Sequence, residues 1–217
     1  MYNENTTSSD YCVEYEQLLD VWAARKHHIG KGFHKDGVFD LDRFAAAPRK
    51  ILFLLKEAYS EGVGYDMRKI LSPVGLNTTW WNIVRWGYAL QHAARGQMPP
   101  YPDFYERGDN EKANAVLVST AVINIKKSDG EHTSTYQDVY KYAQLDGDLL
   151  RRQVALIAAD IVVCGSTWCA VKYLWPEAEK ISERAWKIPD VTFLDFWHPA
   201  ARKRKLLMYD ELCQLTQ

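Results

Sequence analysis

Four short, mostly apolar runs limit the folds open to this chain more than any other feature of its sequence. The runs are Ile51–Leu55, Ala121–Ile125, Asp160–Cys164 and Val191–Phe196. Apolar residues at nearly every position over four to eight residues are typical of strands that are buried on both faces. Stretches with helical spacing separate the runs, and parallel strands need such crossover connections. The sequence therefore predicts an α/β fold, a three-layer sandwich in which a four-stranded, mostly parallel sheet lies between helices on both faces.

Apolar spacing and capping residues predict the helices that cover this sheet. They are expected over Cys12–His28, Thr79–Ala94, Lys112–Ser119, Leu149–Ala159, Ser166–Leu174, Ala178–Lys187 and Arg202–Gln217, with a short helical turn within Leu41–Ala47. No repeat and no clear linker interrupts the sequence, and 217 residues suffice for one full hydrophobic core. We expect a single domain spanning residues 1–217.

Charge and cysteine content exclude several classes of protein. Basic and acidic residues are balanced, 27 against 28, so a nucleic-acid role must depend on local patches rather than on bulk charge. The four cysteines form no Cys-x-x-Cys pair, so we expect no disulfide framework, no metal site and no cofactor. Neither a signal peptide nor a stretch of about 18 apolar residues is found, which predicts a cytoplasmic protein without a membrane partner.

Polar and aromatic residues follow each of the four apolar runs. They are Lys56-Glu57-Ala58-Tyr59, Asn124-Ile125-Lys126-Lys127, Gly165-Ser166-Thr167-Trp168 and Trp197-His198-Pro199. Right-handed crossovers place the carboxyl ends of parallel strands along one edge of a sheet, where α/β proteins keep their binding sites. A carboxylate, an amide, aromatic rings and an imidazole therefore converge there from separate loops. This convergence indicates a functional site more strongly than any single motif does.

This ordered set resembles the uracil-DNA glycosylase superfamily over Ile51–Arg202, in order and in spacing. The family carries three signature loops on a four-stranded parallel sheet, and the first loop of its classical members reads Gly-Gln-Asp-Pro-Tyr-His. Glu57 falls on the acidic residue of that loop and Tyr59 on its tyrosine. Asn124 matches the asparagine that ends the second strand, and His198-Pro199 match the His-Pro that follows the fourth. The resemblance implies a DNA glycosylase, with uracil as the default base.

The chain also departs from the family pattern. Leu55 and Ala58 stand where the first loop has glycine and proline, and Ala200 follows His-Pro where serine is usual. Iron–sulfur branches of the family place a cysteine shortly after the Asn-x-x-Lys of strand two, whereas Ser128 follows here. Another damaged or modified base is therefore a second expectation, and no cluster is expected.

The residue types at this edge suit cleavage of an N-glycosidic bond, for which the base must first leave the stack. Cleavage leaves positive charge on the sugar and negative charge on the departing base. We expect Glu57 to stabilise the cationic sugar and to orient or deprotonate the attacking water. We expect His198 to donate a hydrogen bond to the departing base, for which a neutral imidazole suffices. Asn124 has the donors and the acceptor needed to read a pyrimidine edge.

Further residues are expected around the base and the DNA backbone. Contacts with the base are expected from Lys56, from Tyr59 as a pocket wall, and from Trp80 or Trp81 as a stacking face. Contacts with DNA phosphates are expected from Lys126, Lys127, Ser166, Arg202 and Lys203. The expected partner is single- or double-stranded DNA, bound by a monomer.

Each candidate also has a purely structural explanation. Glu57 could pair with Lys56 or Arg68, His198 could close a turn, and the two tryptophans could pack in their own helix. The alternative function is therefore a non-catalytic member of the same fold that binds nucleic acid or nucleotide, and a hydrolase with an unrelated site is a third. No Gly-x-Ser-x-Gly, Walker or Gly-x-Gly-x-x-Gly motif favours a serine hydrolase, an NTPase or a dinucleotide enzyme.

Overall fold

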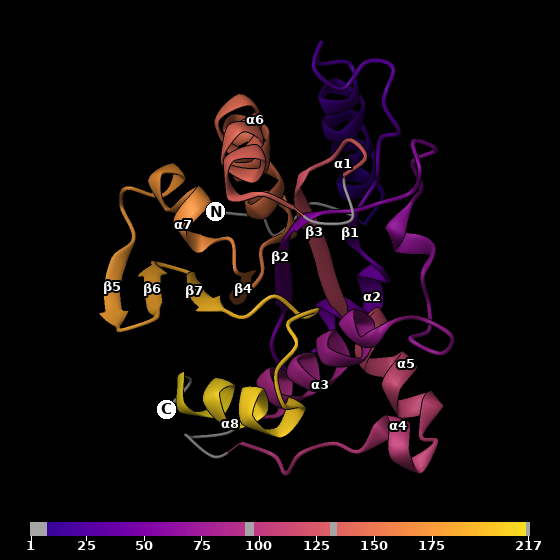
Figure 1. Cartoon of the computed structure of the whole chain (residues 1–217), viewed down its shortest axis with the longest axis vertical. Coiled ribbons are helices and arrows are strands. Elements are labelled where there is room, and N and C mark those ends of the chain that lie inside the picture. Colours follow the sequence, from indigo (N-terminus) through magenta and orange to yellow (C-terminus); the bar gives the residue numbers. More distant parts are fainter. Residues whose placement is uncertain (1–7, 94–97, 131–133, 216–217) are drawn as a thin grey trace.

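A mixed sheet of seven strands lies between two groups of helices (Figure 1). The computed structural model describes residues 8–93, 98–130 and 134–215. The strands are β1 (Gly37–Val38), β2 (Ile51–Glu57), β3 (Thr120–Lys126), β4 (Ile161–Gly165), β5 (Glu179–Ser182), β6 (Ala185–Ile188) and β7 (Val191–Phe196), in the order β1-β3-β2-β4-β7-β6-β5. The predicted α/β class is confirmed, but the predicted number of four strands is wrong.

The four predicted strands form the parallel centre of this sheet. Strands β3, β2, β4 and β7 pair in parallel, in that order. Strand β1 pairs antiparallel with β3 at one end, and β6 pairs antiparallel with β7 at the other. The sequence did not predict the added strands because β1 has only two residues and because β5 is exposed throughout. Such strands carry no run of apolar residues.

Strand β2 shows how the sheet separates two hydrophobic cores. Ile51, Phe53 and Leu55 pack into one core, while Leu52 and Leu54 pack into the other. Alternate side chains of a strand point to opposite faces, so five consecutive apolar residues require cover on both sides. All five are at most 5% exposed, which accounts for the continuous apolar run in the sequence.

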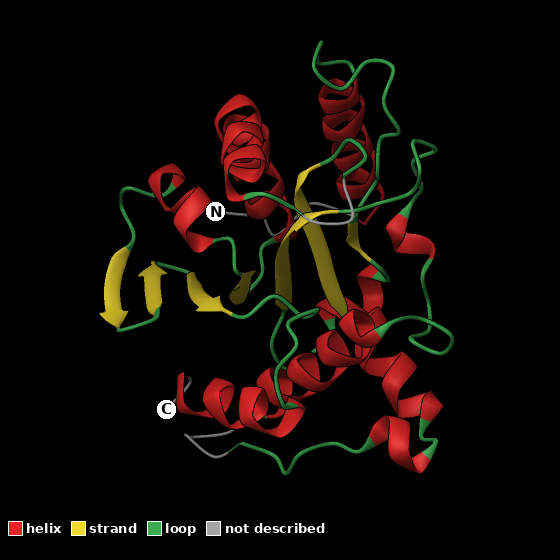
Figure 2. Ribbon diagram, viewed as in Figure 1, coloured by secondary structure: helices red, strands yellow, loops and turns green. Residues whose placement is uncertain are grey.

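Helices supply that cover on each face (Figure 2). The helices are α1 (Ser8–Ala23), α2 (Leu41–Ala45), α3 (Thr78–His92), α4 (Phe104–Arg107), α5 (Asn110–Val118), α6 (Tyr136–Ile157), α7 (Trp168–Val171) and α8 (Lys205–Leu215), with 3-10 turns η1 (Met67–Lys69) and η2 (Lys172–Leu174). Helices α1 and α6 contribute to the core that contains Leu52, whereas α3, α5 and α8 contribute to the core that contains Ile51. None of the described helices is long and apolar enough to cross a membrane.

Several helix limits differ from the predicted ones. Helix α3 ends at His92, and the expected end at Ala94 lies outside the described residues, as does Gln217. Its N-cap is Asn77, whose side chain accepts a hydrogen bond from the Thr79 backbone N–H at 3.0 Å. The helix therefore begins at Thr78, one residue before the expected start at Thr79.

The segment expected to form a helix at Ala178–Lys187 forms the β5–β6 hairpin instead. Strand β6 extends the sheet by pairing with β7, with Ala185 opposite Leu194. Ala185 is buried in the core, whereas every residue of β5 is exposed. Pairing with an existing strand outweighs the weak local helix preference of Ala, Glu and Lys.

Helix α6 begins thirteen residues before the predicted start at Leu149, at Tyr136. Thr135 caps it by accepting a hydrogen bond from the Asp138 N–H. Gly147 lies inside this helix, where it serves packing. A Cβ at Gly147 would overlap the Leu174 side chain, so glycine lets η2 approach the helix closely.

Candidate functional site

The loops that follow β2, β3, β4 and β7 leave one edge of the sheet, because these four strands are parallel. Strands β2 and β7 are not neighbours, since β4 lies between them. The structure therefore brings Glu57 and His198 to one edge, in two separate groups. One group surrounds His198 after β7, and the other surrounds Glu57 at the end of β2.

Ser166 and Asn82 hold the loop that carries His198. Ser166 has a left-handed backbone, with φ of 55°. Its N–H donates to the Phe196 carbonyl at 2.7 Å, and its hydroxyl accepts from the His198 N–H at 3.0 Å. The Asn82 amide of α3 donates to the Pro199 carbonyl at 2.7 Å. Ser166 thus positions the His198 loop. It does not begin the helix that was expected over Ser166–Leu174, because α7 begins at Trp168.

The protonation of His198 follows from its surroundings. The backbone N–H of Ala200 donates to His198 Nδ1 at 3.1 Å, so the proton of the neutral ring lies on Nε2. Burial, and then the positive charge of Lys56, lower the pKa of His198 from 6.5 to about 4. His198 is therefore a neutral hydrogen-bond donor at physiological pH.

Glu57 faces Lys126 across the end of the β2–β3 pair. The two residues are partners in the strand register, and the Glu57 carboxylate lies 2.9 Å from the Lys126 ammonium. Lys126 also donates to Asp138 of α6 at 2.7 Å. Burial lowers the pKa of Lys126, but its bonds to Asp138 and Glu57 outweigh that effect and raise the pKa above its ordinary value. One cation is therefore shared by two carboxylates, which leaves a net charge of −1 on the three groups.

These groups line a polar cavity of about 470 Å³ at the edge of the sheet. Its walls include Lys31, Glu57, Lys126, Asp129, Asp138 and Tyr142. Lys31 donates to the Tyr142 hydroxyl at 2.8 Å. Burial raises the pKa of Tyr142, yet the bond from Lys31 outweighs this and lowers it. The cavity at the strand ends is therefore lined by basic side chains, by acidic side chains and by a phenol whose pKa is lowered.

Asp129 and Gly130 shape the side of this cavity next to Glu57. The Asp129 carboxylate accepts hydrogen bonds from the backbone N–H groups of Ser60 and Gly62, which ties the loop after β2 to the loop after β3. Burial raises the pKa of Asp129, but these backbone bonds outweigh it and lower the pKa. A Cβ at Gly130 would lie 2.5 Å from Glu57 Cδ. Only glycine leaves room for the Glu57 carboxylate in this position.

Glu57 and His198 occupy different parts of the edge. Lys56 and Glu57 are consecutive, and the charge of Lys56 acts on His198 while Glu57 pairs with Lys126. Within the described part of the chain, the lining of the Glu57 cavity does not include His198. The expected convergence of the two groups on one pocket is therefore not seen in this conformation, although both follow strands of the same parallel set.

Asn124 does not face a pocket, which corrects its expected role as a reader of the base edge. The residue is 1% exposed. Its side-chain amide donates to the Met67 sulfur at 3.2 Å, and its backbone N–H donates to Asp36 at 2.8 Å. Asn124 follows Ile123 in β3, so the two side chains point to opposite faces of the sheet. On its own face, Asn124 is covered by turn η1, which carries Met67.

The two tryptophans belong to the core, which corrects their expected role as a stacking face. Trp80 is 8% exposed and contacts Phe39 edge-on, and Trp81 is 6% exposed and contacts Tyr105 in the same way. Tyr59 is 40% exposed and remains accessible on the loop after β2. Packing of α3 on the sheet accounts for both indole rings.

Lys127 lies in the interior, which corrects its expected contact with DNA phosphates. Its ammonium lies 2.7 Å from Asp36 and donates to Gln153 at 2.8 Å, and none of these three side chains is exposed. Burial lowers the pKa of Lys127, against the opposite effect of Asp36. Consecutive residues of an extended chain diverge, so Lys126 reaches the cavity while Lys127 points into the protein.

The basic run after the His198 loop is exposed. Arg202 and Lys203 both face solvent. Lys203 lies over the Trp197 ring, with Nζ 3.4 Å from its centroid, and 3.8 Å from Glu211. Both cations therefore lie exposed beside the His198 loop.

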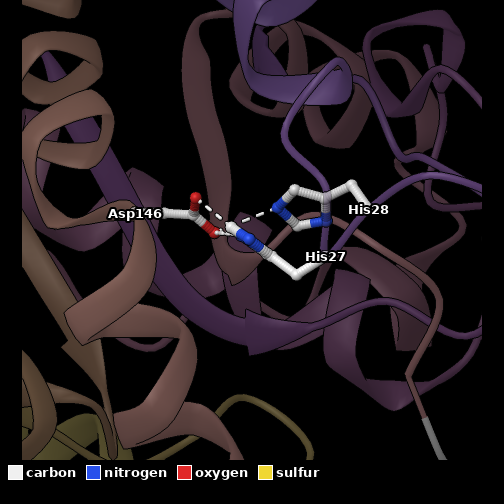
Figure 3. A group of neighbouring side chains, drawn as sticks. All are labelled: His27, His28 and Asp146. Carbon is white, nitrogen blue, oxygen red and sulfur yellow. Dashed lines mark hydrogen bonds and ion pairs between the residues drawn. The ribbon is translucent and has the colours of Figure 1, made fainter.

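A separate cluster that the sequence did not suggest lies behind this cavity. Across residues 8–93, 98–130 and 134–215, His27, His28 and Asp146 form the one group of side chains with the spacing of metal ligands (Figure 3). Both imidazole rings lie within 6 Å of the Tyr142 ring, which lines the cavity. Asp146 is 118 positions from His28, so no local motif marks the group.

No family model matches this chain, and no curated protein matches it. The resemblance to the uracil-DNA glycosylase superfamily thus remains a prediction from the sequence.

Proposed function

We propose that this protein hydrolyses the N-glycosidic bond of uracil, or of another damaged or modified base, in DNA. The observation that carries the proposal is the neutral His198 imidazole, which has its proton on Nε2 and stands at the sheet edge that also bears Glu57. The resemblance of these two positions to the glycosylase loops supports it.

The chemistry of bond cleavage suits the two groups. Negative charge develops on the base as it leaves, and a positioned neutral donor stabilises that charge without needing a proton from solvent. Positive charge develops on the sugar, and the net charge of −1 on Glu57, Lys126 and Asp138 favours it. Glu57 is also a candidate to orient the attacking water.

Binding of DNA would use the exposed cations beside the His198 loop. Arg202 and Lys203 follow that loop directly and are suited to phosphate contacts. Since His198 and Glu57 occupy different parts of the edge, the proposal requires a bound nucleotide to span them or the loops to close on it. Closure of loops around substrate is common among enzymes.

A second candidate is a protein of the same fold that binds nucleic acid or nucleotide without cleaving it. Two observations favour it. Lys126 neutralises much of the Glu57 charge, and Asn124 is not accessible to a base.

Release of free base from substrate separates the two candidates. Purified protein is incubated with single- and double-stranded oligonucleotides that carry uracil or a range of damaged bases, and also with free nucleosides and nucleotides. Free base is measured by chromatography, and abasic sites by alkali cleavage. The proposal predicts base release from at least one DNA substrate. DNA binding without release from any of them would favour the binding protein.

A further inference from the structure

Two imidazole rings that are adjacent in sequence point at one carboxylate. His27 Nε2 lies 2.9 Å from Asp146 Oδ1, and His28 Nε2 lies 3.0 Å from Asp146 Oδ2 (Figure 3). The side chains of His28 and Asp146 are at most 1% exposed, whereas that of His27 is 25% exposed. The cluster is therefore buried on two sides and open toward solvent at His27.

The three groups have the composition and spacing of a metal site. Two imidazole nitrogens and one carboxylate are the protein ligands of many zinc sites that keep a fourth position open. Zinc–nitrogen distances of about 2.0–2.1 Å in a tetrahedral site separate the ligand atoms by roughly 3.3 Å. The three ligand atoms here all lie within 4.8 Å of one another, so small side-chain movements would bring them to that geometry.

The protonation states are compatible with metal binding. Burial raises the pKa of Asp146, but hydrogen bonds from His28 and His27 outweigh it and lower the pKa, so the carboxylate is ionised. On binding, each neutral ring would give its Nε2 lone pair to the metal and carry its proton on Nδ1. Among the described residues, no hydrogen-bond partner reaches His28 Nδ1, so nothing fixes the proton of this ring on Nε2 through that nitrogen.

Arg25 is the competing cation, and it has other partners. Its guanidinium lies 3.1 Å from Asp146, but it also donates to Asp148 and to the Leu145 carbonyl. A carboxylate that binds a metal commonly accepts outer hydrogen bonds as well. Arg25 can therefore remain beside Asp146 as such a partner.

We infer that His27, His28 and Asp146 bind a divalent transition-metal ion of the zinc type. The ion fixes the segment that follows α1 against helix α6. This segment carries Lys31, which donates to the Tyr142 hydroxyl in the wall of the Glu57 cavity. The site therefore holds one wall of the cavity in place, and it is independent of the reaction proposed above.

Titration of chelator-treated protein with Zn²⁺ tests the inference. Calorimetry is expected to show one zinc ion bound per chain, and Co²⁺ is expected to give the visible absorption of a four-coordinate site. Saturating zinc should raise the midpoint of thermal unfolding by about 4 °C or more, because the ion binds the folded state. Hydrogen exchange should slow in residues 24–31.

Glutamine variants separate a metal site from a hydrogen-bonded clamp. His27→Gln and His28→Gln keep an N–H donor for Asp146 but remove a metal ligand, so each should weaken zinc binding roughly 100-fold or more. His92→Gln, which alters an exposed histidine of α3, should leave zinc binding unchanged. Zinc binding that is absent in the wild type, or equal in the wild type and His27→Gln, would overturn the inference. His27→Gln still tests the inference if the variant at the buried His28 fails to fold.

Discussion

The Glu57 carboxylate and the Lys126 ammonium lie 2.9 Å apart at the ends of two neighbouring strands, where the two residues are partners in the strand register. Both side chains are nearly buried, at 4% and 7% exposed. Lys126 divides its charge between Glu57 and Asp138. The pair therefore defines a polar cavity in which the Glu57 carboxylate is oriented by a cation that it shares with Asp138.

Replacing Glu57 with glutamine should lower the rate of base release by about a hundredfold or more, the usual scale for a positioned electrostatic group. DNA affinity should change little, because the group acts mainly in the transition state. Single-turnover base release, measured beside DNA affinity, tests this. Glu61→Gln changes an exposed carboxylate of the same loop and should keep full activity. Full activity in Glu57→Gln would remove Glu57 from the mechanism.

The stability of the protein should depend on pH through His198. Its pKa is about 4 in the folded state against an ordinary 6.5, so only the unfolded chain takes up a proton between these values. The contribution of His198 is therefore complete above pH 6.5 and is lost as the pH falls toward 4. Urea unfolding at several pH values should show a shallower loss of stability in His198→Asn. His92→Asn is the control and should keep the wild-type slope, whereas equal slopes in all three proteins would contradict a depressed pKa.

Gly130→Ala should displace the Glu57 carboxylate, because the added Cβ would lie 2.5 Å from Glu57 Cδ. Base release should fall by at least tenfold if that carboxylate is required in place. Gly75→Ala is a matched loop variant whose positive φ of 78° introduces backbone strain without any contact within 4 Å. It should cost about 1 kcal/mol of stability and leave activity intact. Equal activities in the two variants would show that the position of Glu57 is not critical.

Lys127→Met should destabilise the fold by about 3–5 kcal/mol, because it leaves the buried Asp36 carboxylate without its cation. Adding Asp36→Asn should restore much of the lost stability, since no uncompensated charge then remains. Denaturant unfolding gives both values. DNA affinity of the folded Lys127 variant should match the wild type. A selective loss of DNA binding at unchanged stability would instead restore the sequence-based assignment of Lys127.

Removing Arg202 and Lys203 together should weaken DNA binding regardless of sequence. Each lost phosphate contact should reduce the slope of log affinity against log salt by about 0.9 in duplex DNA. Fluorescence anisotropy at several salt concentrations measures the slope. The control removes Lys180 and Lys187, two exposed lysines of the β5–β6 hairpin, and should leave the slope unchanged. Identical slopes in the wild type and the Arg202/Lys203 variant would exclude this run from the DNA interface.

The sequence by itself determined the central strands and their class. Ile51–Leu55 is apolar at every position because both faces of β2 are covered, and a pattern set by a strand's own burial can be read locally. The limits of Val191–Phe196 were also predicted correctly, because Pro199 follows soon after and cannot continue a strand ladder. Parallel pairing then placed the following loops, including Glu57 and His198, along one edge.

Only the tertiary structure decided where individual polar side chains point. Lys126 and Lys127 are adjacent and of the same residue type, yet Lys126 reaches the cavity and Lys127 pairs with the buried Asp36 carboxylate. The β5–β6 hairpin exists because β7 offers a strand to pair with, which local composition does not record. His27 and His28 meet Asp146 only after α6 packs beside the end of α1. In each case the deciding contact joins residues far apart in the chain, and its energy depends on burial that no local pattern contains.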